Sequence, residues 1–391
     1  ALSPEKVNAN NLYKDRLRTM EISARQQMLS GKADIMTDSL LQRFFNRQLE
    51  RWDDLRKCYR SLQNVKVREV QCGDNVLKVQ YNPARMISTG ANIDKDSLDK
   101  RPCFLCEKNR PKEQMAKNLD NKFDLLVNPF PILPMHFTIP AKRHVPQEIL
   151  HVYGEIHRMV SLFKDLTVFY NGPLCGASAP DHLHLQAGTT GLLPLQTGWQ
   201  RLSRNLDVIL SLNDEENISV IREFVCPAFL IRSKSEKNDI EMFHHLYYAL
   251  PKKKEEVEPM MNIVSWMQND EYLSVVFPRK KHRPDCYSAA GDAQILVSPG
   301  ALDMSGLVIT PRAQDFKKMN AQQLVSILQE VCLSEKEMEG VIDKLNNNFS
   351  PETMIKQMPF FNKQPQVAVG IVSGQKIHFA LNNSLEMMIS Y

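Results

Sequence analysis

The feature that most constrains the fold is a short run in which polar and apolar side chains alternate strictly. His182, His184 and Gln186 are separated by Leu183 and Leu185. Because successive side chains of a β-strand point to opposite faces, we expect a strand with two imidazoles and an amide on one face and leucines on the core side. This pattern indicates a reactive face. A metal-binding pair or a chance polar strand is the alternative interpretation.

This row of side chains suits phosphoryl chemistry. Neutral imidazole is a competent nucleophile towards phosphorus near neutral pH, so attack by His184 on an α-phosphate would give a nucleotidyl-histidine. Gln186 cannot transfer a proton, but its amide can hold a non-bridging phosphate oxygen. Such a site favours leaving groups that need little acid help, such as a phosphorylated sugar or a nucleotide. The preceding loop, GASAPD, lets a ligand approach the backbone closely.

A second informative feature is the pair Cys103 and Cys106, spaced as CxxC. One CxxC is half of a tetrahedral zinc site, and two imidazoles would complete it. His144 and His182 are the candidates. A structural metal held by these four residues would brace the strand that presents His184, which would remain the nucleophile. Two unligated cysteines in a loop, or a redox-active pair, are the alternatives.

Composition limits the classes of protein that need to be considered. The 391 residues include 49 Lys and Arg against 45 Asp and Glu, and this net charge of +4 is too weak to indicate nucleic-acid binding. No segment approaches the roughly 18 uninterrupted apolar residues of a membrane helix. Eight cysteines are sparse for this length and indicate reduced thiols. We therefore expect a globular, cytoplasmic protein of two or three domains.

The pattern along the chain predicts an α+β protein. Amphipathic periodicity predicts one helix over 37–60, and Pro146 is expected to begin another, because its fixed φ suits a first helical position. Strand patterns in the second part repeat those of the first, which indicates a duplicated architecture. The expected organisation is an N-terminal helical extension (1–61), a first α+β half (62–190), a linker with helix (191–215), a second half (216–312), and C-terminal helices with a terminal β-hairpin (313–391).

The HLHLQ run, the CxxC pair and the run that ends at His144 resemble motifs of the histidine-triad (HIT-like) superfamily, specifically of its transferase and phosphorylase branch. This branch includes galactose-1-phosphate uridylyltransferase, diadenosine tetraphosphate phosphorylase and the GDP-hexose phosphorylases. The run VNPFPILPMHFTIPAKRH is similar to the first His-bearing strand of the family, and HLHLQ is similar to its HxHxQ motif, with the transferase Gln in place of the third His of the hydrolases.

The resemblance implies two HIT-like antiparallel-sheet halves with flanking helices, of which only the first bears the motif. It also implies that His184 carries the nucleotidyl group and that Gln186 holds the phosphate. By similarity to zinc-containing uridylyltransferases, the ligands of a structural zinc would be Cys103, Cys106, His144 and His182. Relatives often dimerise, so a homodimer is compatible with the resemblance.

The sequence also departs from the uridylyltransferase pattern. That pattern has Asn-Pro directly before the first His, whereas Ala179, Pro180 and Asp181 stand here. The spelling HLHLQA and the later run VSPGALDMSGLVITPRAQDF are closer to the GDP-hexose phosphorylases. The run QVAVGIVSGQKIHFAL near the end resembles the opening of a SpoIID/LytB-type domain of bacterial cell-wall proteins, which would make this chain part of a longer one.

Several cationic and polar residues are candidates for substrate binding. Arg279, Lys281 and His282 belong to a dense basic cluster at a strand end, which suits phosphate recognition or, equally, a solvated strand end. Further candidates are Arg85, Asn171 and Ser178, for which surface charge or turn chemistry is the alternative. His136 is expected to close the fold near the pocket without a catalytic role.

The leading hypothesis is a nucleotidyltransferase or phosphorylase that acts through a covalent intermediate on His184. The expected substrates are nucleoside diphosphate sugars or dinucleoside polyphosphates, with phosphate or a sugar phosphate as the acceptor. The first alternative is a HIT-type nucleotide hydrolase, in which water takes the acceptor's place. The second is a non-catalytic nucleotide-binding module of a larger cell-wall or signalling protein.

Overall fold

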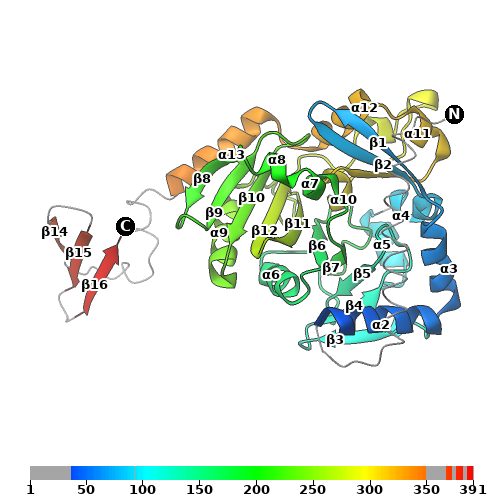
Figure 1. Ribbon diagram of the computed structural model, residues 1–391, viewed down its shortest axis with the longest axis horizontal. Helices are drawn as coiled ribbons and strands as arrows, with labels where there is room; N and C mark the ends of the chain where they lie inside the picture. Colours follow the sequence, from blue (N-terminus) through cyan, green and yellow to red (C-terminus); the bar gives the residue numbers. More distant parts are fainter. Residues whose placement is uncertain (1–36, 92, 349–366, 372–375, 382–384, 391) are drawn as a thin grey trace. The chain divides into compact units, whose positions relative to one another are not determined.

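A computed structural model describes residues 37–91, 93–348, 367–371, 376–381 and 385–390 (Figure 1). The chain divides into two compact units, residues 1–341 and 342–391. In the second unit, β14 (Val367–Ile371), β15 (Lys376–Leu381) and β16 (Leu385–Ser390) form an antiparallel sheet in that order. The predicted terminal hairpin is thus present, with a third strand after it.

The first unit is organised around one sheet of ten strands, in which every neighbouring pair is antiparallel. In spatial order the strands are β3 (Ala116–Leu119), β4 (Phe123–Val127), β5 (His136–Pro140), β7 (His184–Thr189), β6 (Leu166–Asn171), β11 (Met261–Gln268), β12 (Glu271–Pro278), β10 (Ala228–Ser233), β9 (Asn217–Ile221) and β8 (Asp207–Ser211).

The large sheet consists of two five-stranded halves with the same topology. The order β3-β4-β5-β7-β6 in the first half matches β8-β9-β10-β12-β11 in the second, and the halves join where β6 pairs with β11. In chain order, each half has one long helix between its third and fourth strands. These helices are α6 (Tyr153–Leu162), between β5 and β6, and α9 (Glu236–Ala249), between β10 and β11, and they contact each other. The predicted duplication is therefore confirmed at the level of topology.

The two halves differ in the connection beside the HLHLQ strand. In the first half, β6 and β7 are joined by the long loop 172–183, whereas β11 and β12 are joined by Asn269 and Asp270 alone. Both residues of that turn have positive φ, 51° and 61°, as a tight two-residue hairpin requires. Only the first half therefore has, before its last strand in chain order (β7), a loop long enough to enclose a ligand.

A smaller sheet covers one face of the large one. It contains β1 (Lys66–Cys72), β2 (Asn75–Tyr81) and β13 (Leu307–Thr310), with β13 parallel to β2. Buried residues of this sheet share a hydrophobic core with Phe169 and Val264 of the large sheet. Phe169 is paired with Gln186, and paired residues share a face. The smaller sheet therefore lies on the same side of the large sheet as the polar side chains of the HLHLQ run.

Helices surround these sheets. Figure 1 shows α2 (Thr37–Arg51) across β3 and β4, with α3 (Asp53–Leu62) beside it. The hydroxyl of Tyr59 donates to the carbonyl oxygens of Asn128 and His136, at 3.1 and 2.9 Å, and so fastens the start of β5. The other helices are η1 (Pro83–Arg85), α4 (Met86–Thr89), α5 (Lys95–Lys100), η2 (Glu107–Asn109), α7 (Pro194–Thr197), α8 (Trp199–Leu202), η3 (Asp285–Tyr287), η4 (Gly291–Ala293), α10 (Ala301–Met304), α11 (Ala313–Lys318), α12 (Ala321–Val331) and α13 (Glu335–Asn348).

Three elements differ from the sequence-based expectation. The helix expected over 37–60 is interrupted at Trp52, whose backbone is extended (φ −126°, ψ 97°). The helix expected from Pro146 begins at Tyr153, because the backbone of Val145 and Gln147 bonds to Leu183 and Pro180 of the loop 172–183 and not along a helix. β8 lies inside the expected linker 191–215, where it pairs with β9 and completes the second half.

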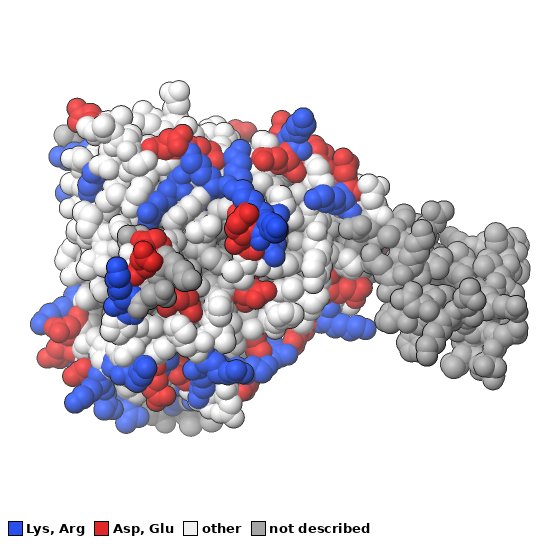
Figure 2. Space-filling view, turned by 180° about the vertical axis from the view of Figure 1, so that it is seen from behind, with Lys and Arg blue, Asp and Glu red and all other residues white. Residues whose placement is uncertain are grey.

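The surface mixes charges of both signs. On the face shown in Figure 2, basic and acidic side chains lie side by side. Surface ion pairs of the first unit include Arg222 with Asp207 at 2.9 Å and Lys164 with Asp270 at 2.8 Å. Among the described residues, none of the helices is both long and apolar enough to cross a bilayer.

A buried carboxyl group, Glu258, links the segment before α6 to β6 of the sheet and makes stability depend on pH. It is 2% exposed and accepts hydrogen bonds from the Tyr170 hydroxyl at 2.6 Å and from the backbone N–H of Ile149 at 2.8 Å. Burial raises its pKa from 4.5 to about 7, although these two bonds oppose the shift. Between pH 4.5 and 7 the native protein therefore holds a proton that the unfolded chain releases. Stability should fall as pH rises through this window, by up to about 1.4 kcal/mol per pH unit.

We expect Glu258→Gln to lose less stability than the wild-type protein between pH 5 and pH 7, because the variant lacks this titrating group. Urea denaturation at the two pH values measures the difference. Glu69→Gln, which changes an exposed carboxylate on β1, is the matched control and should keep the wild-type pH dependence. Equal pH dependence in all three proteins would contradict the assignment.

Candidate functional site

His184 is the first residue of β7 and is 5% exposed. Its Nδ1 lies 2.8 Å from the carbonyl oxygen of His182. Because a carbonyl can only accept, Nδ1 carries the ring proton and Nε2 has the free lone pair. Burial lowers the pKa of His184 to about 4, although the bond to the His182 carbonyl opposes this shift. The ring is therefore neutral near pH 7, with Nε2 as its nucleophilic atom.

Gln186 is held by His136, the first residue of β5. The backbone N–H of Ile132 donates to His136 Nδ1 at 3.1 Å, so His136 Nε2 carries the proton and donates to Gln186 Oε1 at 3.0 Å. Burial, with a smaller contribution from the charge of Arg85, lowers the pKa of His136 to about 3. The imidazole thus stays neutral, and the Gln186 amide is oriented with its two N–H groups free to donate to a ligand.

Asn171, the last residue of β6, is oriented by residues of the second half. Its Oδ1 accepts from the backbone N–H of Ala301 at 2.7 Å and from Asn262 Nδ2 at 2.9 Å. Asn262 Oδ1 in turn accepts from Arg279 Nη1 at 2.6 Å. Asn171 Nδ2 is therefore the donor available to a ligand. A side chain at Gly300 would place its Cβ 3.1 Å from Asn171 Oδ1, a tight contact that would require the Asn171 amide to shift.

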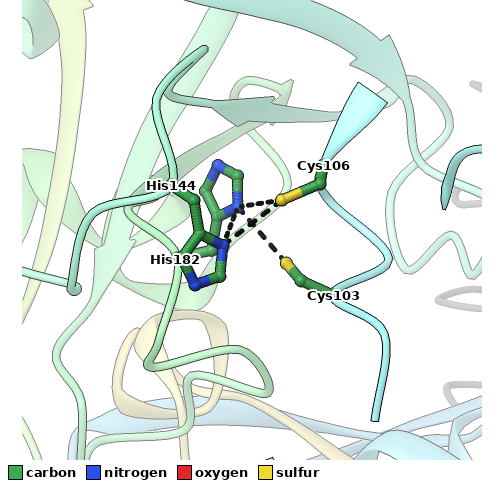
Figure 3. A group of neighbouring side chains, drawn as sticks. All are labelled: Cys103, Cys106, His144 and His182. Atoms are coloured by element: carbon green, nitrogen blue, oxygen red, sulfur yellow. Dashed lines mark hydrogen bonds between the residues drawn. The ribbon is translucent and has the colours of Figure 1, made fainter. Parts of the chain in front are cut away.

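The structure brings together the four predicted metal ligands, Cys103, Cys106, His144 and His182 (Figure 3). Figure 3 shows the two sulfur atoms and two ring nitrogens pointing toward one another. His182 Nδ1 lies 3.2 Å from Cys103 Sγ and 3.2 Å from His144 Nδ1, and Cys106 Sγ lies 3.3 Å from His144 Nδ1. Ligands of a tetrahedral zinc are separated by about 3.3 to 3.8 Å, given its bond lengths to nitrogen and sulfur. The donor set therefore fits a metal ion.

The outer nitrogens of both imidazoles support this arrangement. His182 Nε2 lies 2.7 Å from the carbonyl oxygen of Ala141, so it carries the proton and leaves Nδ1 as a donor atom for a metal. His144 Nε2 lies 3.8 Å from Asp181 Oδ2. His182 itself precedes the strand rather than belonging to it, because its backbone N–H closes a turn onto the Ala179 carbonyl. The predicted strand thus begins two residues later than expected, at His184.

Arg85 and Ser178 remain compatible with substrate binding. Arg85 is half-buried, donates to the Phe130 carbonyl at 3.1 Å, and is close enough to influence the pKa of His136. Burial lowers its own pKa to about 10, although the charge of Asp303 opposes this shift. Ser178 lies in the loop 172–183, where its carbonyl accepts from Arg101 at 2.9 Å.

The basic cluster is mostly engaged within the protein. Arg279 is 2% exposed, and its five N–H groups donate to acceptors of five residues, namely Val331, Asn262, Pro299, Lys281 and His282. The Lys281 ammonium bonds to two carboxylates, those of Asp285 and Glu330. His282 is half-buried, and burial lowers its pKa to about 4. This bonding favours a structural role for Arg279 and Lys281, because a substrate contact by either would require these bonds to open.

Sequence reasoning did not identify Asn262, Gly300 or Ala301. Asn262 is a polar residue at the start of an otherwise apolar strand, MNIVSWMQ, and this was the one local signal available. Gly300 and Ala301 lie in a loop and a short helix, and no spacing in the sequence relates them to Asn171. Their contribution arises from the pairing of β6 with β11, which the sequence pattern does not specify.

Two family models match the chain, one over each half of the large sheet. Residues 44–189 match the domain of unknown function DUF4922, and residues 207–351 match the model described as GDPGP1-like, C-terminal domain. The interval between the two matches falls between β7 and β8, where the first half ends and the second begins. No curated protein matches the chain.

Solved structures with some likeness include yeast Ap4A phosphorylase Apa2. The match has 13% identity and a TM-score of 0.47, and it covers 72% of this chain and 94% of that one. The same enzyme in complex with AMP has 14% identity and a TM-score of 0.48, covering 73% and 96%. A DUF4931 family protein from Bacillus cereus ATCC 10987 has 14% identity and a TM-score of 0.32, covering 44% and 88%.

The two family models, and not these distant structural likenesses, carry the comparison with known proteins. The DUF4922 match contains the HLHLQ run and the four clustered Cys and His residues. The GDPGP1-like match contains Asn262, Arg279 and Ala301, which together orient Asn171 beside His184. Residues 44–189 thus resemble the domain of unknown function DUF4922, and residues 207–351 resemble the C-terminal domain of GDPGP1-like proteins.

Proposed function

We propose that this protein is a nucleotidyltransferase or phosphorylase that forms a covalent nucleotidyl-histidine on His184. The observation that carries the proposal is the hydrogen bond from His184 Nδ1 to the His182 carbonyl at 2.8 Å. It places the ring proton away from Nε2, and none of the residues that the structure describes bonds to Nε2. A neutral imidazole with a free lone pair is the form that attacks phosphorus. The GDPGP1-like domain supports a substrate that contains a nucleotide.

The proposed reaction has two displacements. His184 Nε2 attacks the α-phosphorus of the donor, the bond from phosphorus to the bridging oxygen breaks, and the leaving group departs with that electron pair. A phosphate oxygen of the acceptor then attacks the same phosphorus, and the bond to Nε2 breaks. No group in this scheme protonates the leaving oxygen, since Gln186 cannot act as an acid. This favours donors whose leaving group is a phosphate, namely nucleoside diphosphate sugars or dinucleoside polyphosphates.

The oriented amides would stabilise the charge that develops on the non-bridging oxygens. Gln186 Nε2 and Asn171 Nδ2 are both left as donors by the networks that hold their oxygen atoms. Arg85, which lies close to the His136–Gln186 pair, and Ser178 in the loop above the strand would contact the phosphates of the donor or acceptor. Donors that are already oriented need no reorganisation during the reaction.

We further propose that Cys103, Cys106, His144 and His182 hold a structural zinc ion. A zinc bound there would neutralise the thiolates and tie three separate segments together. The loop that carries the cysteines, the end of β5 and the turn before β7 would thus be held in one arrangement. Because His182 is two residues from His184, the site would fix the start of the strand that presents the nucleophile.

His184→Ala should abolish the covalent intermediate and lower kcat by roughly 10⁴-fold or more, the scale on which losing a nucleophile acts. Incubation with donors radiolabelled at the α-phosphate, followed by denaturation, should leave acid-labile label on the wild-type protein alone. His151→Ala, which changes an exposed histidine outside the site, is the control and should label normally. Equal labelling of His184→Ala would rule out the mechanism. Absence of label on the wild-type protein across a broad donor panel would favour a non-catalytic binding module.

The acceptor separates a phosphorylase from a hydrolase of the same superfamily. If phosphate or a sugar phosphate is the acceptor, it should appear in the product and should raise the rate of turnover. A rate and product independent of both acceptors would indicate transfer to water.

Gln186→Ala should lower kcat by about 10²- to 10³-fold, as expected when one preorganised donor to a developing oxyanion is removed. The KM of the donor should change much less, because the contact strengthens in the transition state. Steady-state kinetics with a labelled donor measure both values. A rise in KM at unchanged kcat would instead assign Gln186 to ground-state binding.

The purified protein should contain about one equivalent of zinc by elemental analysis, and Cys106→Ser should lose most of this metal and melt at a lower temperature. Cys286→Ser, at a half-buried cysteine outside the cluster, should retain both metal and melting temperature. Less than about half an equivalent in the gently purified wild-type protein would contradict the ligand assignment.

A further inference from the structure

The pairing between β6 and β7 stops just before the candidate nucleophile. The last pair in the ladder is Phe169 with Gln186. In the same register, the next two pairs would be Tyr170 with Leu185 and Asn171 with His184. The residues of the second of these pairs carry the groups proposed to act on the substrate. The strand ends at the site therefore lack the backbone hydrogen bonds that hold the rest of the hairpin.

The side chain of Gln147 occupies this position between the strands. Its Oε1 accepts from the backbone N–H of His184 at 2.8 Å. Its Nε2 donates to the carbonyl oxygens of His184 at 3.0 Å and of Asn171 at 2.9 Å. Gln147 is fully buried, and both N–H groups of its amide are used. One planar group thus replaces the missing ladder and fastens both strand ends.

The backbone around Gln147 explains how this side chain reaches the site. Residues 144–149 follow β5 and belong to neither a helix nor a strand, and α6 begins only at Tyr153. The backbone N–H of Gln147 donates to the Pro180 carbonyl at 3.0 Å, and the Val145 carbonyl accepts from Leu183 at 2.7 Å. Gln147 therefore contacts the loop 172–183 through its backbone and both strand ends through its side chain.

The hydrogen bonds at position 147 restrict which side chain can stand there. The site must accept from one N–H and donate to two carbonyls without carrying a charge, and among side chains only a primary amide meets this requirement. Asn would be shorter by one methylene, and Glu would supply the acceptor but neither donor. The three bonds hold the backbone of His184 and Asn171 in one register, so the directions of the imidazole and of the amide donor are set together.

We propose that Gln147 is the positioning residue that aims His184 Nε2 and Asn171 Nδ2 at the same phosphate. This inference rests on the proposed nucleotidyl transfer. Gln147 does not touch the substrate. It acts by holding the backbone of the residues that do.

The test uses Gln147→Ala with Gln196→Ala as a matched control. Gln196 is also a buried glutamine, and it fastens the opposite end of the same hairpin through Thr167 at 2.7 Å and Thr190 at 3.1 Å. Both substitutions leave buried groups unpaired, so both should lower the melting temperature. Only Gln147→Ala should lower the single-turnover rate of His184 labelling, by roughly 10- to 100-fold, the scale expected for a misplacement of about 1 Å. The dissociation constant of the donor should stay within about threefold.

Gln147→Glu covers the case in which Gln147→Ala does not fold. It preserves the shape of the side chain and the acceptor for His184 N–H but removes both donors, so the labelling rate should again fall while the Gln196 variant keeps the wild-type rate. Equal labelling rates in the Gln147 and Gln196 variants would overturn the proposal. A loss of donor affinity that accounts for the whole effect would also overturn it.

A measurement without turnover separates this proposal from the proposed function. With histidine labelled with ¹⁵N, the His184 ring should show a single tautomer protonated at Nδ1 in the wild-type protein and in Gln196→Ala. In Gln147→Ala the ring should show mixed tautomers or a shifted Nδ1 signal. If none of the donors labels the wild-type protein but this difference in the His184 signals is seen, the positioning role stands and the nucleotidyl transfer fails. If labelling occurs and the His184 signals are identical in all three proteins, the positioning role fails.

Discussion

The central antiparallel contact between β6 and β11 is the constraint on which the rest of the site depends. It pairs Asn171, the last residue of β6, with Asn262 of β11 in the second half. Because pairing register is all-or-none, a shift of one residue would turn Asn262 to the other face. Arg279 and the loop that contains Gly300 then contact the same cluster. The second half thus has no HLHLQ run, yet it supplies the network that orients an amide of the first half.

Buried hydrogen-bond networks decide which end of each amide faces the ligand. The oxygen of Gln186 is taken by His136, and that of Asn171 by Ala301 and Asn262. A buried polar group without a partner costs about 1 to 3 kcal/mol, so the alternative orientations are disfavoured. The same logic fixes the His184 tautomer through the His182 carbonyl. The candidate site is therefore a set of donors and one lone pair, each held in place by hydrogen bonds to neighbouring groups of the protein.

The loop 172–183 and the start of β7 are anchored from two directions. The Cys and His cluster lies on one side, where His182 joins segments far apart in the sequence. Gln147 lies on the other, where it replaces the ladder at the strand ends. The second half needs neither anchor, because its corresponding strands are joined by a two-residue turn. The long loop is thus the element that distinguishes the half with the proposed reactive site from the other half.

Local patterns in the sequence were sufficient for part of this picture. Alternation in HLHLQ predicted a strand, which begins at His184 and not at His182, and CxxC with His144 and His182 predicted the four clustered residues, because a metal site requires these residue types. Strand patterns also indicated the duplicated halves. What the sequence determined by itself was therefore the identity of the reactive groups.

Only the tertiary structure decided how those groups are aimed. The roles of Gln147, Asn262 and Gly300 arise from contacts between segments as far apart in the sequence as Asn171 and Gly300, and no local pattern encodes such pairing. The same is true of Arg279, whose charge indicated phosphate binding, whereas its five bonds to residues of a strand, a helix and loops are visible only in the folded chain. Residue type sets what a side chain can do. The partners that burial brings to it determine which of those capacities remains available.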